Sequence, residues 1–511
     1  MGGVKLADIF QDAMVLQRDK PVYIWGECET GMELTVRLGK QEVSCTAEGE
    51  NFCAKLPPMP AARGLELSVS AKRGDILTGS GKDAPLILHD ISIGDVYLAS
   101  GQSNMEYFLR YEAHFDELRR EPENPDIHMY NVPRIAYEGQ ERKLCDSGYW
   151  FTKGSKAWRS FSAIGYVFAK YIQEVTGVPV GIIGCNWGGT PAAAWISEEY
   201  LEKSPLNVFE QEYELAMQGK SKLEIEKESK EGWDFEDSYR QQMDWRAMMY
   251  GLTLEEQEEW IKEHGQDPVI PMGPYHHWRP SGLYHTMVSR IAPYTVKGVL
   301  WYQGESDDIH GDIYDRTFEA LVDCWRDAWR DSELPFFTVQ LAPFGKWMEC
   351  NGELYPIVRE SQQKAAKNIP GVYMTSIMDL GMYEDIHPKE KSEIARRLAL
   401  LAMEHLYYLP VLGECPEMWE MVCRGSRLTI VFRNVGDGLA LDGCRLKALE
   451  VWQNGEAVSI TDMSLQKDKL VLECANLADG EVLVEFAWSG YCEVNLYNSM
   501  GLPAKPFRGR V

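Results

Sequence analysis

Long apolar runs and clusters of basic residues are both missing from this 511-residue sequence. A helix that crosses a membrane needs roughly 18 or more consecutive apolar residues, and no such run occurs. The formal net charge is −26, and the acidic residues are scattered widely with no basic stripe among them. Because basic stripes are what neutralise phosphate groups, we expect neither nucleic acid nor a membrane as a partner.

The N-terminus and the cysteines lack the patterns of a secreted protein. The opening stretch, MGGVKLADIFQDAMVLQRDK, contains no apolar segment behind a basic one, so it does not resemble a secretion signal. The 12 cysteines are scattered and form no Cys-x-x-Cys pair, which favours reduced thiols. Together these absences predict a cytoplasmic protein.

The two ends of the chain have the pattern of β-structure. A chain of this length exceeds what one hydrophobic core usually organises, which predicts two or three domains. Residues 14–90 contain short segments of alternating apolar and polar residues, and this period-two pattern returns after about residue 409. It predicts an N-terminal β-sandwich domain over residues 1–91 and a C-terminal β-rich domain over residues 409–511.

Residues 92–408 have a different pattern, in which buried apolar strands alternate with amphipathic helices. This alternation predicts an α/β domain whose parallel sheet is covered by helices on both faces. The predicted strands are residues 95–100, 180–186, 296–303, 335–341 and 371–378, and the predicted helices are residues 157–176, 316–330, 355–368 and 389–407.

A long insertion, residues 198–280, interrupts this alternation. It is rich in Glu, Lys, Gln and Met, and its charge runs are typical of solvated helix faces. If part of it covers a pocket, that part would act as a lid or a substrate platform.

Polar side chains follow the predicted strands, at the edge where ligands bind in an open parallel sheet. The loops concerned are residues 101–103, 186–190, 303–307 and 379–387. Together they supply a hydroxyl, glycine amides, a side-chain amide, carboxylates and an imidazole. This set of groups predicts a catalytic site at one edge of the sheet.

Ser103 is the candidate nucleophile of such a site. A serine hydroxyl is a weak nucleophile at neutral pH and needs an adjacent base to take its proton, for which His387 is the candidate. A carboxylate must orient that imidazole and stabilise its cationic form. Asp385 and Glu384 are the nearest carboxylates in the sequence.

Attack of a serine on an ester carbonyl creates an oxyanion, which preorganised N–H donors must meet. The amides of Ser103 and Gly188 and the side chain of Gln303 are the donors that we expect. Each residue also has an ordinary explanation, because a serine after a strand often caps a helix and paired glycines often make a turn. Four such loops at one predicted sheet edge nevertheless favour a site.

Two other chemistries have less support. The spacing of His276, His277 and His310 fits no zinc or calcium pattern, so we expect no metal and no cofactor. Glu305 and Asp307 have the residue types of a glycosidase pair, but they share one loop and no second carboxylate is marked to face them.

The stretches that carry these residues resemble the SGNH-type esterases, and among them the sialate O-acetylesterase family. The matching stretches are IGDVYLASGQSNME (93–106), NWGGTPAAAWIS (186–197), RPSGLYHTMV (279–288), GVLWYQGESD (298–307) and DIHPKEK (385–391). The resemblance implies a three-layer αβα domain flanked by β-rich domains. It also implies that Ser103 is the nucleophile, that Gly188 or Gly189 and Gln303 complete the oxyanion hole, and that His387 is the base.

Two positions depart from the family pattern. The wider superfamily has an Asp three residues before the catalytic His, and here that position is Glu384, whereas Asp385 lies two before it. We favour Asp385 as the carboxylate partner, with Glu384 as the alternative. His285 stands where an Asn is expected. The residues that we expect to contact substrate are Gln102, Asn104, Trp187, Arg279, Tyr284, His285 and Glu305.

The reaction implied by the resemblance is hydrolysis of an O-acetyl ester on a sugar through an acetyl-serine intermediate. Sialic acid is an anion, so an enzyme that acts on acetylated sialate should offer Arg or Lys, and Arg279 is a candidate. Acetylated xylan or mannan oligosaccharides are an equal alternative. A rival from another class is a non-catalytic protein that binds carbohydrate with its flanking β-domains.

Overall fold

The computed structural model describes residues 4–72, 85–140, 147–236, 239–265, 270–475, 477–478 and 480–511. The chain has a mixed α/β fold made of large β-sheets and helices. It divides into two units, of which the first comprises Met1–Ser238, Val269–Trp301 and Ala320–Phe336. The second comprises Tyr239–Pro268, Tyr302–Glu319 and Phe337–Val511.

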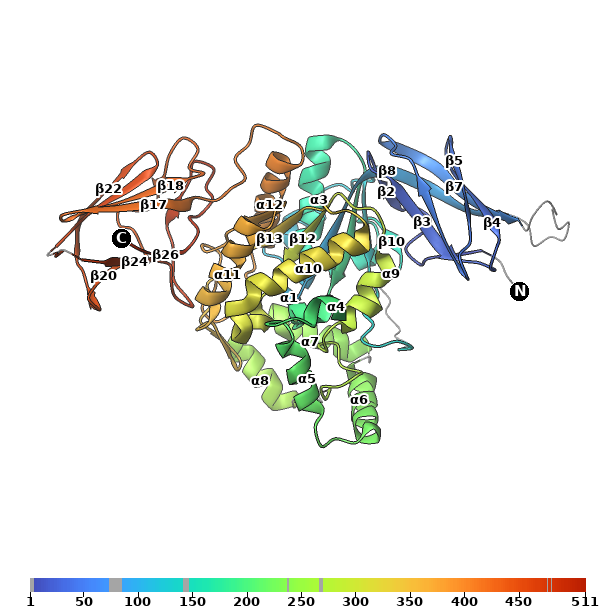
Figure 1. Ribbon diagram of the computed structural model, residues 1–511, viewed down its shortest axis with the longest axis horizontal. Coiled ribbons are helices and arrows are strands. Elements are labelled where there is room, and N and C mark those ends of the chain that lie inside the picture. Colours follow the sequence, from blue (N-terminus) through green and yellow to red (C-terminus); the bar gives the residue numbers. More distant parts are fainter. Residues whose placement is uncertain are drawn as a thin grey trace. The chain divides into compact units, whose positions relative to one another are not determined.

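The N-terminal strands lie in the first unit and follow the predicted period of two. In β4 (Glu33–Leu38), the side chains of Leu34, Val36 and Leu38 are buried because alternate residues of a strand point to the same face. Strand β4 pairs with β5 and β7, and β1, β3 and β6 form a second sheet. These strands lie together in the blue part of the chain (Figure 1). The other bounds are β1 Lys5–Leu6, β2 Val15–Gln17, β3 Val22–Glu27, β5 Gln41–Thr46, β6 Asn51–Leu56 and β7 Ala62–Lys72.

Strand β8 (Leu86–Gly101) connects the N-terminal strands to the sheet that holds the candidate nucleophile. Its first half pairs with β7 in the antiparallel direction, and its second half pairs with β11 (Val180–Asn186) in the parallel direction. Burial is continuous from Ile91 onward, as in a strand that is covered on both faces. The boundary predicted between residues 91 and 92 therefore falls inside one continuous strand.

The rest of this sheet in the first unit has the order β10, β9, β11, β8 and β12, and its β9–β11 pair is also parallel. Helix α3 (Ala163–Thr176) packs on β11. Ser162 begins this helix by accepting the N–H of Gly165 at 3.0 Å, so α3 starts later than the predicted residue 157. The remaining bounds here are β9 Ile127–Asn131, β10 Trp150–Phe151, β12 Gly298–Tyr302, α1 Ser103–Glu106, α2 Phe115–Arg120 and α9 Ser289–Ile291. Short helices of other types are η1 Leu109–Tyr111, η2 Lys156–Ser160, η3 Ala192–Trp195 and η4 Tyr284–Val288.

The α/β part of the second unit has strands β13 (Phe336–Val339) and β16 (Val372–Thr375), which are neighbours in one sheet. Helix α11 (Tyr355–Asn368) has the predicted bounds, and α12 (Lys391–His405) lies within the predicted residues 389–407. Their apolar faces are buried, as the helical spacing of the apolar residues requires. The remaining bounds are β14 Lys346–Trp347, β15 Cys350–Asn351, η5 Glu305–Ile313 and α10 Tyr314–Trp329, the last of which runs through the ranges of both units.

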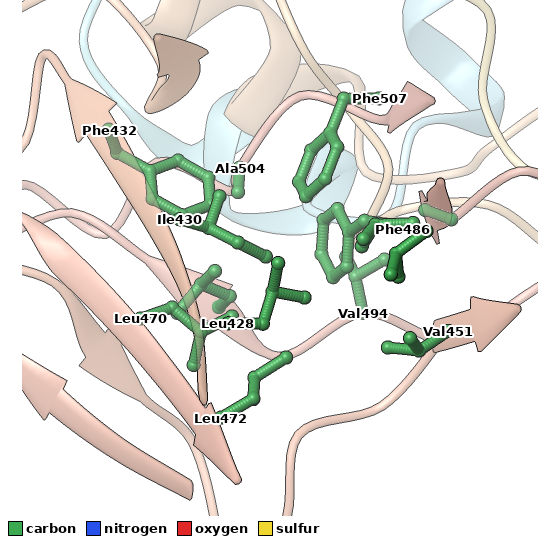
Figure 2. Close-up of a cluster of buried hydrophobic side chains, with 14 of the residues drawn as sticks. Leu428, Ile430, Phe432, Val451, Leu470, Leu472, Phe486, Val494, Ala504 and Phe507 are labelled. Carbon is green, nitrogen blue, oxygen red and sulfur yellow. The ribbon is translucent and has the colours of Figure 1, made fainter. Parts of the chain in front are cut away.

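The C-terminal strands also belong to the second unit and form two four-stranded sheets, β17-β18-β23-β22 and β21-β20-β24-β26. Alternate residues of β18 (Arg427–Arg433) point inward, where Leu428, Ile430 and Phe432 meet Phe486 and other apolar side chains (Figure 2). The other bounds are β17 Glu417–Arg424, β19 Ala440–Leu441, β20 Leu449–Gln453, β21 Glu456–Ala457, β22 Ile460–Gln466, β23 Lys469–Cys474, β24 Val482–Phe486, β25 Leu496–Tyr497 and β26 Phe507–Arg510.

Arg359 of α11 connects the C-terminal residues to the α/β part of the second unit. Its guanidinium group is fully buried and donates to the carbonyl oxygens of Leu341 (3.0 Å), Ala342 (2.9 Å), Ser489 (2.7 Å) and Gly490 (2.8 Å). Burial lowers the pKa of Arg359 to about 10, a value at which the group is still charged at neutral pH. A buried cation therefore holds backbone on both sides of the boundary predicted at residue 409.

The charge-rich insertion is helical, as its composition predicts. Helices α4 (Glu198–Leu201), α5 (Val208–Met217) and α6 (Lys222–Glu236) lie in the first unit, and α7 (Tyr239–Gly251) and α8 (Leu254–His264) lie in the second. None of the helices in the described part of the chain combines the length and apolarity that a membrane span requires.

Candidate active site

The end of β8 brings Ser103 next to the glycine loop. Gly101 of β8 pairs with Asn186 of β11, and the N–H of Trp187 donates to the carbonyl of Gly101 at 3.1 Å. Ser103 and Gly188 each lie two residues beyond this pair. A Cβ atom placed on Gly188 would lie only 3.4 Å from Cβ of Ser103. The parallel register thus brings the candidate nucleophile and one of the expected glycines into contact.

Ser103 begins the four-residue helix α1, and its side chain is nearly buried, at 7% exposure. The carbonyl of Gln102 accepts the N–H groups of Met105 (3.0 Å) and Glu106 (2.9 Å), which closes the turn. Gln102 and Asn104, both expected to contact substrate, are buried on either side of Ser103.

The glycine loop is held by two contacts that no sequence pattern predicts. The N–H of Gly188 donates to Oε2 of Glu106 at 2.6 Å. Gly189 has a φ of +76°, a conformation that favours glycine, and a Cβ atom there would lie 3.2 Å from the ring of Trp278. Gly188 is therefore bound to a carboxylate, and Gly189 is covered by an indole.

Aromatic rings surround this loop. The ring of Trp187 stacks on His277 with centroids 4.7 Å apart, and His277 stacks on His276 at 4.8 Å. Trp233 of α6 lies 5.9 Å from Trp187, and Trp278 is 42% exposed beside Gly189. We call these five residues the aromatic cluster. Part of the insertion therefore packs on the loop that follows β11.

His276 belongs to this cluster as a packed, neutral ring. Its Nδ1 accepts the N–H of Trp278 at 2.9 Å, and burial lowers its pKa to about 4. Within the described residues, no three side chains of His, Cys, Asp or Glu converge as metal ligands would.

Of the other residues expected to contact substrate, Arg279 directly follows the aromatic cluster, whereas His285 lies beside α4 and against Tyr284. His285 is exposed, and its Nε2 lies 2.8 Å from Glu198 of α4. The ring of Tyr284 packs against that of His285, with centroids 5.3 Å apart, and the contacts with α4 are made by His285. Arg279 is half-buried and packs its stem against Gly282.

The candidate base lies in the second unit with one of its two possible carboxylate partners. Nδ1 of His387 lies 3.3 Å from Oδ1 of Asp385, and the same oxygen accepts the backbone N–H of His387 at 2.8 Å. Both side chains are buried, whereas Glu384 is exposed. The turn thus directs Asp385, and not Glu384, toward the imidazole.

The surroundings of His387 are aromatic. The rings of Tyr250, from α7 of the insertion, and Trp347 meet the imidazole edge-on at 5.1 Å and 5.3 Å. Burial lowers the pKa of His387 and outweighs the opposing effect of Asp385, while the charges of Lys391 and Lys389 lower it further. The imidazole is therefore neutral at neutral pH, as a general base must be.

Asp385 is ionised. Burial by itself raises its pKa, but the interactions with His387 and Lys389 outweigh burial and bring the pKa below its ordinary value. Nζ of Lys389 lies 2.7 Å from Oδ2 of Asp385 and also donates to the carbonyl of Tyr250 at 2.8 Å.

Gln303 follows β12 and is fully buried in the second unit. Its Nε2 donates to Oδ2 of Asp307, and its Oε1 accepts the hydroxyl of Tyr314 at 2.9 Å. These two contacts fix the orientation of the amide group. Glu305 is buried in the same loop and raises the pKa of Tyr302 and Tyr355, although burial is the larger cause in both.

Known proteins that are similar to this chain are esterases. Residues 272–403 match the family described as carbohydrate esterase, sialic acid-specific acetylesterase. The chain is 25% identical to the sialate O-acetylesterase of Homo sapiens, over 99% of this chain and 92% of that protein. These similarities support a carbohydrate esterase.

Two further relatives of this carbohydrate esterase cover nearly all of it. The sialate O-acetylesterase of Rattus norvegicus is 25% identical over 100% of this chain and 95% of that protein. The crystal structure of a carbohydrate acetylesterase from Xanthomonas citri superposes with a TM-score of 0.76 at 24% identity and covers 99% of both chains. That structure supports the fold of the carbohydrate esterase along its whole length.

Sequence reasoning missed several neighbours of the predicted residues in this carbohydrate esterase. They are Glu106, Trp233, Tyr250, Trp347 and Lys389. Glu106 and Lys389 lie within the stretches that resemble the family, so their positions could have been noticed in the sequence. Trp233 and Tyr250 come from the insertion, where no motif marks them.

Proposed function

We propose that this carbohydrate esterase hydrolyses O-acetyl esters of sugars with Ser103 as its nucleophile. The observation that carries the proposal is the pairing of Gly101 with Asn186, because it brings the Ser103 side chain against the glycine loop. A serine beside backbone N–H donors is what acyl transfer requires.

In the first half of the reaction, Oγ of Ser103 attacks the acetyl carbonyl carbon while His387 takes the hydroxyl proton. The resulting tetrahedral oxyanion collapses, the bond from the carbonyl carbon to the sugar oxygen breaks, and His387 returns the proton to that oxygen. The products of this half are the free sugar hydroxyl and an acetyl group on Ser103.

In the second half, His387 takes a proton from water as the water oxygen attacks the acetyl-serine. The tetrahedral intermediate collapses, the bond from the carbonyl carbon to Oγ of Ser103 breaks, and His387 returns the proton to Oγ. Acetic acid leaves and ionises to acetate in water. The lowered pKa of His387 supports its role as base, and the nearby ionised Asp385 supports the transient imidazolium.

The oxyanion donors in this proposal are the amide of Ser103, an amide of the glycine loop and the side chain of Gln303. Of the two glycines, Gly189 is the better candidate because Gly188 donates its N–H to Glu106. The anchoring of the Gln303 amide by Asp307 and Tyr314 supports a preorganised donor.

The finer architecture belongs to the same proposal. Residues 92–408 form a three-layer αβα domain of the SGNH type, and residues 1–91 and 409–511 form the flanking β-rich domains. The parallel β8–β11 and β9–β11 pairs support the first part, and the two C-terminal four-stranded sheets support the second.

The sugar is either a sialate or a neutral acetylated oligosaccharide of the xylan or mannan type. A sialate carboxylate calls for a cation, and Arg279 directly follows Trp278 of the aromatic cluster, with its Nε hydrogen-bonded to no described residue. The aromatic cluster suits the apolar face of either sugar.

The test is acetate release by the wild-type protein and by Ser103→Ala. Substrates are O-acetylated sialic acid, acetylated xylo-oligosaccharides and acetylated manno-oligosaccharides under matched conditions. Ser100→Ala is the control, because Ser100 is a buried serine of β8, three residues before Ser103, whose hydroxyl donates to the carbonyl of Cys185. We expect Ser103→Ala alone to lose activity. Unchanged acetate release by Ser103→Ala would overturn the assignment, and binding without hydrolysis by the wild type would favour a carbohydrate-binding protein.

A further inference from the structure

Glu106 is a buried carboxylate that none of the steps above uses. It is the last residue of α1, three positions after Ser103, and only 1% of it is exposed. Removal of a carboxylate from water is costly unless hydrogen bonds and a counter-charge compensate for it. Glu106 has both a hydrogen bond and a counter-charge, and the hydrogen bond comes from the glycine loop next to Ser103.

The two oxygens of Glu106 have different partners. Oε2 accepts the backbone N–H of Gly188 at 2.6 Å, and a hydrogen bond to an ionised acceptor is stronger than one between neutral groups. Oε1 lies 3.4 Å from a guanidinium nitrogen of Arg134. The carboxylate thus connects the helix of the nucleophile to the glycine loop, and Arg134 supplies the opposite charge.

The same peptide unit is held at its other end. The N–H of Gly188 and the carbonyl of Trp187 belong to one planar peptide group, and that carbonyl accepts the hydroxyl of Thr190 at 2.8 Å. Glu106 and Thr190 therefore hold this peptide plane from both sides. The next N–H along the chain belongs to Gly189, and it donates to no other described residue.

We propose that Glu106 is a positioning residue that fixes the Trp187–Gly188 peptide, so that the N–H of Gly189 meets the oxyanion. This inference rests on the proposed function of Ser103. Without the Glu106 acceptor, the Trp187–Gly188 peptide can rotate, and the N–H of Gly189 then no longer points toward the oxyanion. Gly188 is close to both groups: an added Cβ would lie 3.3 Å from Oε2 of Glu106 and 3.4 Å from Cβ of Ser103. A rotation of this peptide therefore changes the surroundings of the nucleophile.

The experiment compares Glu106→Ala with Glu106→Gln, since the Gln side chain keeps an oxygen that can accept the Gly188 N–H. Steady-state kcat and KM are measured on an aryl acetate and on an acetylated oligosaccharide. We expect Glu106→Ala to lower kcat by about a hundredfold, with KM changed less than about twofold, because the loss resembles that of one oxyanion donor. Glu106→Gln should recover most of this loss.

Glu112→Ala is the matched control, because Glu112 is also buried in the first unit and its Oε2 accepts a backbone N–H, that of His114 at 2.7 Å. It should lower stability without a fall in kcat. If Glu106→Ala does not fold, Thr190→Val tests the other end of the same peptide and should also lower kcat. Wild-type kcat in Glu106→Ala, or equal loss in the Ala and Gln variants, would overturn the inference. An active Ser103→Ala would instead overturn the proposed function.

Discussion

Nζ of Lys389 lies 2.7 Å from Oδ2 of Asp385, the carboxylate whose other oxygen lies beside the imidazole of His387. A cation at this place stabilises the ionised carboxylate and opposes protonation of the imidazole. It lies on the short turn that carries both residues, so the turn itself helps to set the pH range in which His387 acts as a base.

Replacement of Lys389 should move the pH profile in a predictable direction. The acidic limb of kcat/KM reports the pKa of the free base, which must be neutral to accept a proton. Because Lys389 lowers the pKa of His387, Lys389→Met should raise that pKa and move the acidic limb to higher pH. The measurement is kcat/KM on an aryl acetate across the acidic and neutral range. Lys389→Arg keeps the charge and should leave the limb in place, and a limb that moves to lower pH in Lys389→Met would contradict this account.

Asp385→Asn and Glu384→Gln should differ sharply in activity. Asp385 lies 3.3 Å from Nδ1 of His387, whereas Glu384 is exposed. Loss of the negative charge at Asp385 should lower kcat on the order of a hundredfold or more, because the imidazolium formed during the reaction is no longer stabilised. Asn keeps an oxygen that can accept the backbone N–H of His387, so the turn should survive. A loss confined to Glu384→Gln would reverse the choice of carboxylate.

Trp278→Ala should separate sugar esters from simple esters. The indole is 42% exposed and lies against Gly189, where the ring of a sugar can pack on it. We expect kcat/KM for acetylated oligosaccharides to fall about tenfold, which is about 1.4 kcal/mol, with less than about a twofold change for ethyl acetate. Trp419→Ala is the control, since Trp419 is 62% exposed in β17, and it should change neither value. Equal losses on both kinds of ester would assign Trp278 a purely structural role.

Arg397 should be a major contributor to stability. This buried residue of α12 lies 2.7 Å from both oxygens of Asp379 and 2.8 Å from Glu393. Arg397→Met removes the cation that pairs with Asp379 and leaves Glu393 with Arg396 alone, and it should cost about 3–5 kcal/mol. Arg396→Met is the control, because Arg396 pairs with the same Glu393 at 2.7 Å but is more exposed, and it should cost less than about 1 kcal/mol. Urea unfolding followed by tryptophan fluorescence measures both, and equal midpoints would refute the expectation.

The regular elements were predictable because their apolar spacing is local. The strand at residues 180–186 and the helix at residues 355–368 have the predicted bounds. The contact of Ser103 with Gly188 was also predictable, because the two residues follow neighbouring parallel strands and such strands end at the same edge of a sheet. The later start of α3 was missed because Ser162, and not an earlier residue, supplies the cap.

The partners of the predicted residues were harder to foresee. Tyr250 lies in a segment whose charge pattern favours solvated helices, and no local pattern marks which residue of such a helix reaches an imidazole far along the chain. Glu106 was missed for a different reason. It lies within a quoted motif, but glutamates are rarely fully buried, and the N–H and the cation that compensate this one become visible in the structure.

The four carbonyl groups that surround Arg359 constrain how this chain can change during evolution. Two of them come from residues after 488 and two from residues before 343, so a chain that ended earlier would leave a buried cation with half of its acceptors. Deletion or exchange of the C-terminal strands would require a second, simultaneous change at Arg359. The stability of the C-terminal region is therefore coupled to that of α11, and the terminal β-strands are not an interchangeable module.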